Sequence, residues 1–184
     1  MIYPIVIYGS PLLRKVSGKI DLKDPSLKQL VDDMFETMYV SDGVGLAAPQ
    51  IGKSLRLFVI DGSEMSQDDP TLLGFKSAFI NPKIVERTGD KCTWAEGCLS
   101  LPKIHEDVDR PEKIRIQYYD ENLQFHDENY EGMKARIIQH EYDHLEGILF
   151  IDHLSPLRKK LLKGKLNDIA KGKVSTAYKT RLVK

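Results

Sequence analysis

Apolar residues recur with helical spacing near both ends of the chain. Asp24 is a natural N-cap with Pro25 in the first turn, and apolar residues then follow at the i, i+3, i+4, i+7 spacing of one buried face as far as Met38. Near the C-terminus, Ser155 and Pro156 begin a second such stretch. The apolar residues of this stretch, which we expect to face the core, are Leu157, Leu161, Leu162, Leu166 and Ile169. The spacing therefore predicts an N-terminal and a C-terminal helix.

Shorter apolar or alternating stretches between these helices predict strands, because they are bounded by turn residues. We expect strands at residues 2–8, 55–60, 78–85 and 114–118, with residues 122–126 pairing with the last of these across a turn at 120–122. The polar stretch 61–74 is expected to be an exposed loop.

A third helix is predicted between Glu131, which places negative charge near its start, and Gly147, a natural stop. His140 and His144 are four residues apart, so on a helix both imidazoles project from one face and can reach one metal ion, with Glu141 beside them as a proton carrier. This is the HExxH arrangement of a metallohydrolase. The pattern is short, and a surface helix with chance histidines is the alternative.

A catalytic metal site needs three protein ligands if a fourth position is to stay open for water, and the helix supplies two. In the longer zinc-protease pattern the third would be at position 150, which is Phe150 and cannot ligate. Asp152, His153 and Asp168 downstream and Cys98 upstream remain as candidates. Cys98 is the strongest by chemistry, because a thiolate beside a divalent cation is deprotonated outright.

Residues 43–52 are nearly free of charge and dense in small side chains, which let another backbone approach closely. The stretch lacks the pattern of a phosphate-binding loop. It suits either an extended peptide lying along its edge, with Gln50 offering a side-chain amide, or a tight internal turn.

With 184 residues, 41% of them hydrophobic and 29% charged, the chain fits one catalytic domain spanning residues 1–184. Cys92 and Cys98 are too few for a disulfide framework, and no apolar run approaches a membrane span. We therefore expect a cytoplasmic protein. Its charge is uneven, because the stretch from Arg158 onward holds ten basic residues against Asp168 alone. The basic C-terminal helix and tail, from about residue 156, either fold against the acidic remainder or meet an acidic partner.

Three stretches, taken together and in this order, resemble the motifs of the peptide deformylase family. They are GVGLAAPQIG at residues 43–52, EGCLSLP at 96–102 and QHEYDHLEGILF at 139–150. The resemblance covers most of the chain but not the loop at 61–74 or the residues after about 163. With the predicted elements it implies an α+β fold, in which antiparallel β-sheets pack around the central HExxH helix, with an N-terminal and a C-terminal helix.

The resemblance implies a metal held by Cys98, His140 and His144, with Glu141 moving the proton. Ferrous iron is the usual metal of the family, and zinc, nickel or cobalt can occupy the site. Sulfur and nitrogen ligands alone would favour zinc. The resemblance also implies that the Gln50 amide and the Leu99 backbone N–H stabilise the oxyanion, and we add Asp143 as a candidate hydrogen-bond partner of a ligating histidine.

The implied substrates are N-formylmethionyl peptides and nascent chains, hydrolysed to formate and a free N-terminal methionine. We expect the peptide to lie extended beside Gly43, Val44, Gly45 and Leu46, with its methionine side chain in an apolar pocket. Nearness to the motifs suggests Trp94, Met133 and Ile137 for that pocket. The protein is expected to be a monomer, and its basic tail to contact the ribosome or to balance the acidic body.

Two other functions use the same residues. A metallopeptidase would cleave internal peptide bonds with His140, Glu141 and His144, and its third ligand would differ from Cys98. A binding protein could hold a structural zinc ion with Cys92, Cys98, His140 and His144, which would leave no open coordination position and no role for Glu141.

Overall fold

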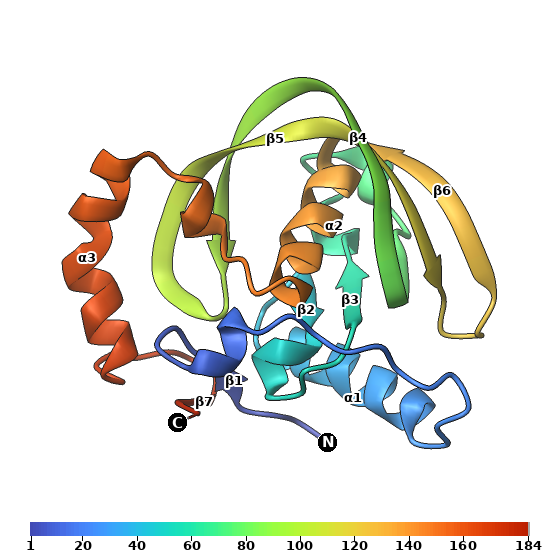
Figure 1. Cartoon of the computed structure of the whole chain (residues 1–184), viewed down its shortest axis with the longest axis horizontal. Helices are drawn as coiled ribbons and strands as arrows, with labels where there is room; N and C mark the ends of the chain where they lie inside the picture. The colour runs from blue at the N-terminus through green and yellow to red at the C-terminus, as the bar shows by residue number, and fades with distance from the viewer. Residues whose placement is uncertain (184) are drawn as a thin grey trace.

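A five-stranded antiparallel sheet, ordered β2-β3-β4-β5-β6, curves around helix α2 in the computed structural model, which describes residues 1–183 (Figure 1). The elements are β2 (Gly45–Ala47), β3 (Leu57–Asp61), β4 (Lys76–Cys98), β5 (Leu101–Tyr119), β6 (Phe125–Glu131) and α2 (Gly132–Leu145). The α+β fold of antiparallel strands around the HExxH helix, with one helix before it and one after it, is confirmed.

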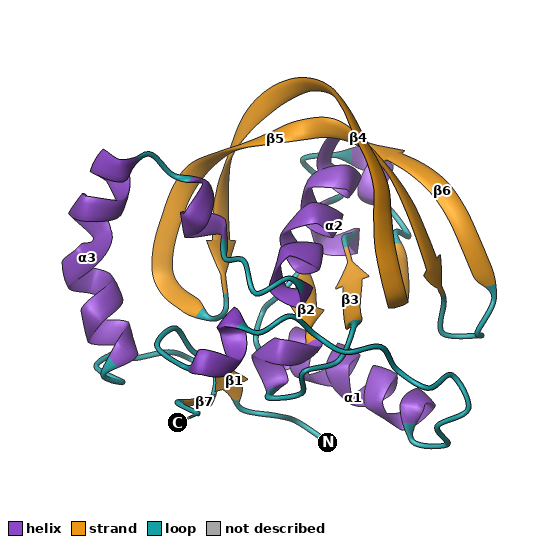
Figure 2. Cartoon of the chain, viewed as in Figure 1, coloured by secondary structure: helices purple, strands orange, loops and turns teal. Residues whose placement is uncertain are grey.

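The two central strands are far longer than the sequence indicates. Strand β4 has 23 residues and β5 has 19, and together they arch over α2 (Figure 2). Alternation is present in β5, but Glu106 and Arg110 occupy two of its inward positions, so apolar alternation does not reveal the strand. The hairpin carries Cys98, at the end of β4, back to the C-terminal half of α2.

Helix α1 (Leu27–Val40) begins later than predicted, because the Asp24 carboxylate accepts hydrogen bonds from the N–H and hydroxyl of Ser26 in the preceding turn. It packs under β2 and β3 through an apolar face that includes Met34 and Met38. The expectation of an N-terminal helix is therefore confirmed, with its start moved by two residues.

Helix α3 (Pro156–Ala170) begins as predicted, with the Ser155 hydroxyl accepting from the Arg158 N–H. The prediction that its five apolar residues all face inward is wrong for two of them: Leu157 and Leu161 are 66% and 64% exposed. The helix stands at one side of the sheet (Figure 1), and only its Leu162 and Ile169 side chains are buried. A helix that packs along one narrow stripe leaves the neighbouring apolar positions in solvent.

The two ends of the chain meet beneath the sheet (Figure 1). Strand β1 (Ile5–Val6) pairs in parallel with β7 (Thr180–Arg181), so the expected opening strand is much shorter than residues 2–8. The stretch expected as a loop at 61–74 contains two short 3-10 helices, η3 (Ser63–Met65) and η4 (Pro70–Leu72). Among residues 1–183, no helix combines the length and apolar character needed to cross a membrane.

Candidate active site

Helix α2 and the end of β4 bring together three possible metal ligands. The Sγ atom of Cys98 lies 3.3 Å from Nε2 of His144, and the ligand atoms of Cys98, His140 and His144 all lie within 4.8 Å of one another. The other candidate ligands Asp152 and His153 are engaged elsewhere, with Arg14 and Asp143 respectively. A soft thiolate with two imidazoles fits a divalent transition metal and leaves room for a further ligand.

The surroundings of Cys98 favour the ionised form of its thiol. Burial raises its pKa, but the neighbouring His144 and His140 outweigh burial and lower the pKa to about 5. Metal binding requires the thiolate and neutral imidazoles. A bound cation therefore displaces the protons that these three side chains hold in its absence.

Glu96 on β4 orients one of the ligating histidines. Its Oε2 atom lies 2.9 Å from Nδ1 of His140, which directs the other ring nitrogen toward Cys98. Arg110 and Arg136 donate to the same carboxylate, at 2.6 Å from Nε of Arg110 and 2.7 Å from Nη1 of Arg136. Burial raises the pKa of Glu96, but His140 and Arg110 hold it well below the usual range, so the carboxylate is charged.

Asp143 does not contact a ligating histidine, which corrects its assignment as the partner of one. Its carboxylate accepts from Arg110 at 2.8 Å and lies 2.8 Å from Nε2 of His153. Asp143 is linked to the ligating histidines through Arg110, which also donates to Glu96, the hydrogen-bond partner of His140.

Glu141 stands beside the three ligands with one oxygen free. Burial raises the pKa of its carboxyl to about 7, against the lowering effect of His140 and His144. Among residues 1–183 its Oε2 atom is buried without a hydrogen-bond partner, as is Nδ1 of His144. A Cβ atom on Gly45 would lie 2.5 Å from Oε1 of Glu141, so the small residue in β2 makes room for the carboxylate. Glu141 can therefore accept and return a proton near neutral pH.

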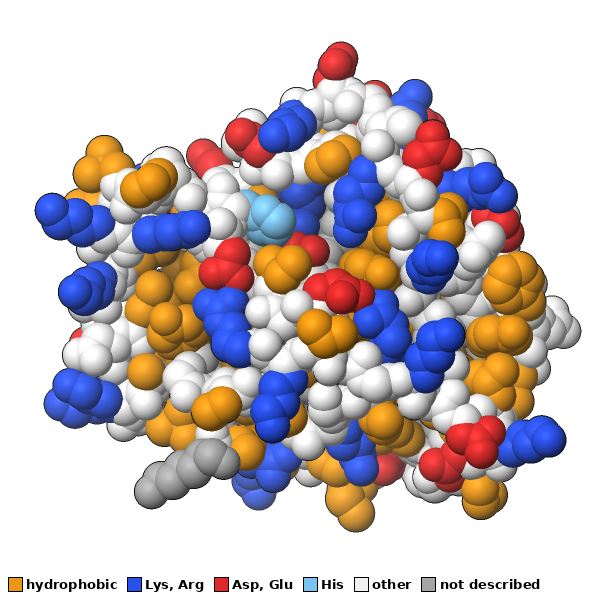
Figure 3. Space-filling model, viewed as in Figure 1, with side chains coloured by type: hydrophobic (Ala, Val, Ile, Leu, Met, Phe, Trp, Pro, Cys, Tyr) orange, Lys and Arg blue, Asp and Glu red, His pale blue; other side chains and the backbone are white. Residues whose placement is uncertain are grey.

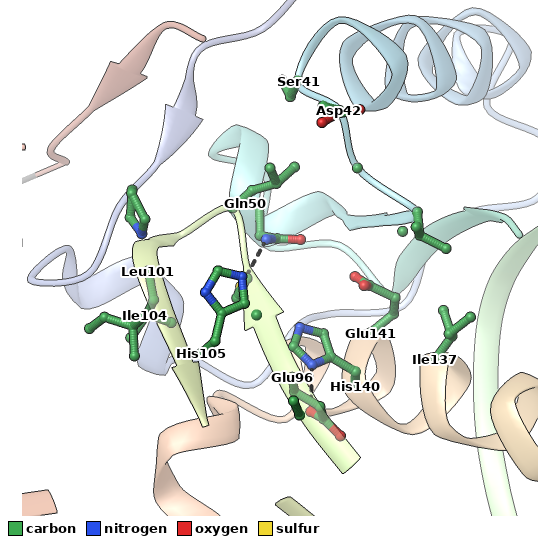
Figure 4. Close-up of a pocket in the computed structure, with 18 of the residues that line it drawn as sticks. Ser41, Asp42, Gln50, Glu96, Leu101, Ile104, His105, Ile137, His140 and Glu141 are labelled. Atoms are coloured by element: carbon green, nitrogen blue, oxygen red, sulfur yellow. Dashed lines mark hydrogen bonds and ion pairs between the residues drawn. The ribbon is translucent and has the colours of Figure 1, made fainter. Parts of the chain in front are cut away.

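Two groups that can donate to a developing negative charge lie next to Cys98. The Gln50 amide is fixed because its Oε1 atom accepts from the Ala47 N–H at 2.8 Å, which turns Nε2 toward Ser100 Oγ at 3.2 Å and Cys98 Sγ at 3.5 Å (Figure 4). The Leu99 backbone N–H makes no hydrogen bond within residues 1–183, although Leu99 lines the same cavity.

A cavity of about 530 Å³ opens over these groups, between β2, the β4–β5 turn and α2 (Figure 4). Of the residues predicted to bind substrate, it is lined by Gly43, Val44, Gly45, Met133 and Ile137. Leu46 is instead fully buried in the core against α1. Trp94 is 55% exposed and pairs with Val108 outside the cavity, so placing it there from its nearness to Cys98 in sequence is corrected.

Other lining residues carry no sequence signal for this site. Met65 comes from η3 and His105 from β5, and Ala177 and Tyr178 come from the segment after α3. No motif or spacing links these positions to the helix, because only the fold brings them there.

The chain is similar to known proteins over nearly its whole length. A family model described as polypeptide deformylase matches residues 2–160. The peptide deformylases of Christiangramia forsetii and Cytophaga hutchinsonii are 48% and 50% identical; each alignment covers 98% of this chain, with 96% and 97% of the relative. The crystal structure of peptide deformylase from Thermus thermophilus has a TM-score of 0.83 at 40% identity, covering 94% of this chain and 99% of that one.

Proposed function

This chain belongs to the polypeptide deformylase family, and from that premise we propose that Cys98, His140 and His144 hold the metal on which its activity depends. The protein is a metallohydrolase that removes the N-formyl group from nascent peptides. For the metal we propose ferrous iron, with zinc, nickel or cobalt as alternatives that the same thiolate and imidazole ligands accept.

When bound, such a metal lowers the pKa of a water molecule and polarises the formyl carbonyl. Glu141 takes the proton from the attacking water, whose oxygen bonds to the formyl carbon. As the bond from that carbon to nitrogen breaks, Glu141 returns the proton to the leaving amine. The products are formate and a free N-terminal amine. A carboxyl with a pKa of about 7 and one unpartnered oxygen is suited to both transfers.

The Gln50 amide and the Leu99 N–H are the proposed donors to the oxyanion that forms when water attacks. Gln50 is held in place by Ala47, so little reorganisation is needed at the moment of reaction. Losing one such donor typically costs about 10²- to 10³-fold in rate.

We propose that the peptide extends the sheet at β2. This strand is the first in the sheet order, so its second edge is free of any other strand of residues 1–183. An extended peptide placed there gains backbone hydrogen bonds and lies beside Gly43, Val44 and Gly45, at the cavity. Met133 and Ile137 offer apolar surface for a methionine side chain.

The observation that carries this proposal is the meeting of Cys98 with the two histidines of α2, beside a carboxylate with a free oxygen. A structural zinc site would need Cys92, but its sulfur lies 3.5 Å from Nη2 of Arg136 and 3.6 Å from the Arg110 carbonyl oxygen, outside the cluster. The test is metal analysis of the purified protein combined with hydrolysis of a formyl-methionyl tripeptide. One metal per chain and release of formate are expected, whereas cleavage of internal peptide bonds would indicate a metallopeptidase.

We further propose that the basic face of α3 contacts the ribosome in the cytoplasm, with the protein acting as a monomer. Lys and Arg side chains are spaced along this helix at the left margin of the molecule (Figure 3). A cationic face is attracted to the phosphate surface of ribosomal RNA, and this attraction weakens as salt is raised. Arg158 is partly neutralised by Glu106, at 2.6 Å, but the lysines at 160, 163 and 165 are exposed and have no acidic partner within residues 1–183.

This contact is tested by replacing four lysines of α3, at 159, 160, 163 and 165, with glutamine. The matched control replaces four exposed lysines near the N-terminus, at 15, 19, 23 and 28, with the same change in net charge. Weaker co-sedimentation with ribosomes at low salt is expected only for the α3 variant, with hydrolysis of a short peptide unchanged in both. Equal co-sedimentation of the two variants would refute the contact.

A further inference from the structure

The segment after α3 returns to the catalytic end of the molecule and forms part of the cavity wall. Its last residues bind the N-terminal part of the chain: the Ile5 N–H donates to Lys179 O at 2.8 Å, and the Val183 N–H donates to Ser10 Oγ at 2.9 Å. Between Gly172 and these contacts, Ala177 and Tyr178 reach the cavity. These contacts hold the chain after the two residues that line the site, and before them the chain is held at the end of α3, where the Lys173 N–H donates to the Asp168 carbonyl oxygen at 2.8 Å.

Tyr178 contacts the turn that presents both a metal ligand and a proposed oxyanion donor. Its hydroxyl donates to the Leu99 carbonyl oxygen at 2.8 Å, and Leu99 directly follows Cys98. Burial raises the pKa of Tyr178 to about 12, so the hydroxyl remains a neutral donor at any pH at which the protein works.

The turn needs such support from outside the hairpin. Cys98 pairs with Leu101, so Leu99 and Ser100 form a two-residue connection between β4 and β5. Two-residue connections favour turns with positive φ, which match the twist of the strands, but neither Leu99 nor Ser100 has a positive φ. Three contacts hold the turn instead: Tyr178 on the Leu99 carbonyl, Gln50 on the Ser100 hydroxyl, and the Tyr8 N–H on the Ser100 carbonyl.

We propose that Tyr178 is a positioning residue for the hydrolytic reaction, which fixes the Leu99 carbonyl and with it the Leu99 Cα atom, so that the Leu99 N–H stays directed at the oxyanion. This inference rests on the proposed role of Leu99. The carbonyl that Tyr178 binds belongs to the Leu99–Ser100 peptide, which shares the Leu99 Cα atom with the Cys98–Leu99 peptide that carries the Leu99 N–H. Releasing the carbonyl lets the turn shift at this Cα atom, and the Cys98–Leu99 peptide shifts with it. The N–H of Leu99, which has no other partner within residues 1–183, then loses its fixed direction. A donor that is present but poorly oriented stabilises the transition state less than a fixed one does, so the effect falls on turnover.

The test is Tyr178→Phe in the full-length, metal-loaded protein. It removes the hydroxyl and keeps the ring, and a formyl-methionyl tripeptide is the substrate. We expect kcat to fall about tenfold, less than the loss of a whole oxyanion donor, with KM within about twofold and metal content unchanged. The amide ¹H–¹⁵N resonance of Leu99 should shift. Tyr118→Phe is the matched control: it removes a buried hydroxyl with a 2.8 Å contact to Tyr130, neither residue lines the cavity, and kcat should not change.

Failure of the proposed role of Tyr178 and failure of the proposed deformylase function give different results. A wild-type kcat in Tyr178→Phe, or a loss that follows metal content or thermal unfolding, would assign Tyr178 a structural role only and overturn the proposal. If the wild-type protein released no formate, the proposed function would fail, whereas the Leu99 resonance would still report whether Tyr178 orients that peptide.

Discussion

Glu96→Gln should weaken both the fold and the metal site, because this buried carboxylate joins two arginines to a ligating histidine. Glu96 is 7% exposed and faces Arg110, Arg136 and His140. Arg110 keeps Asp143 as a second carboxylate, but among residues 1–183 Arg136 retains only the carbonyl oxygens of Val108 and Cys92 and the Cys92 sulfur. A glutamine side chain keeps one acceptor oxygen, but its NH₂ group would face the arginine and histidine N–H groups, which are also donors.

The expected losses of folding free energy and metal affinity follow from the charges and hydrogen bonds that Glu96 balances. Glu96 and Asp143 balance Arg110 and Arg136, so the substitution leaves one buried positive charge uncompensated. Breaking a buried ion pair costs about 3–5 kcal/mol, a large part of the roughly 5–15 kcal/mol that stabilises a typical domain. Removing the partner of a ligating histidine typically lowers metal affinity by about 10- to 100-fold, equivalent to roughly 1.4–2.7 kcal/mol.

The assay is urea unfolding of the metal-free protein together with competition for metal against a chelator of known affinity. Glu106→Gln is the control, since Glu106 is opposite Glu96 in the hairpin but pairs with Arg158 on α3, away from the ligands. Because the pKa of Glu96 is lowered in the fold, its contribution is present above its unfolded value of 4.5 and is lost as the pH falls. Below about pH 4.5, the free energy of unfolding of Glu96→Gln should therefore fall less steeply with decreasing pH than that of the wild type. Metal affinity equal to that of Glu106→Gln would refute the reasoning.

Three further predictions test the site, the first with Cys92→Ser as its control. Cys98→Ser should lose most bound metal and activity while Cys92→Ser keeps both, measured by metal analysis and formate release; equal loss in the two would point to a four-ligand structural site. Glu141→Ala should retain metal but lose at least about 10²-fold in kcat, since the ligands survive and the proton carrier does not; a wild-type rate with full metal would contradict its role. Gly45→Ala should lower kcat more than it lowers the melting temperature, because its methyl group displaces the Glu141 carboxylate; unaltered turnover would show that the carboxylate can shift without cost.

The parts of the site that the sequence predicts are those set by local geometry. Residues four apart on a helix share a face in any fold, so His140 and His144 could be placed beside Glu141 without a structure. Cys98 is the strongest of several candidate ligands by its chemistry. The structure brings it, among the candidates, to the two histidines.

Parts that depend on tertiary contacts could not be predicted. Asp143 and Glu96 are both acidic residues within the motifs, and only the path of the long hairpin decides that Glu96 meets His140. Trp94 is close to Cys98 in sequence, yet its side chain lies outside the cavity. The helical spacing of Leu157 and Leu161 indicates an apolar face but does not show how much of that face the body covers.

The pairing of β1 with β7 also bears on the order in which the molecule assembles. Ile5 and Thr180 are partners from opposite ends of the chain, so their contact closes a loop that includes nearly every residue. Contacts of such long sequence separation carry the largest loop-closure cost and form after local ones. We therefore expect the HExxH helix to form early in folding and the wall containing Tyr178 to close last. A newly made copy would then present the two histidines of α2 before the Leu99 N–H is aligned.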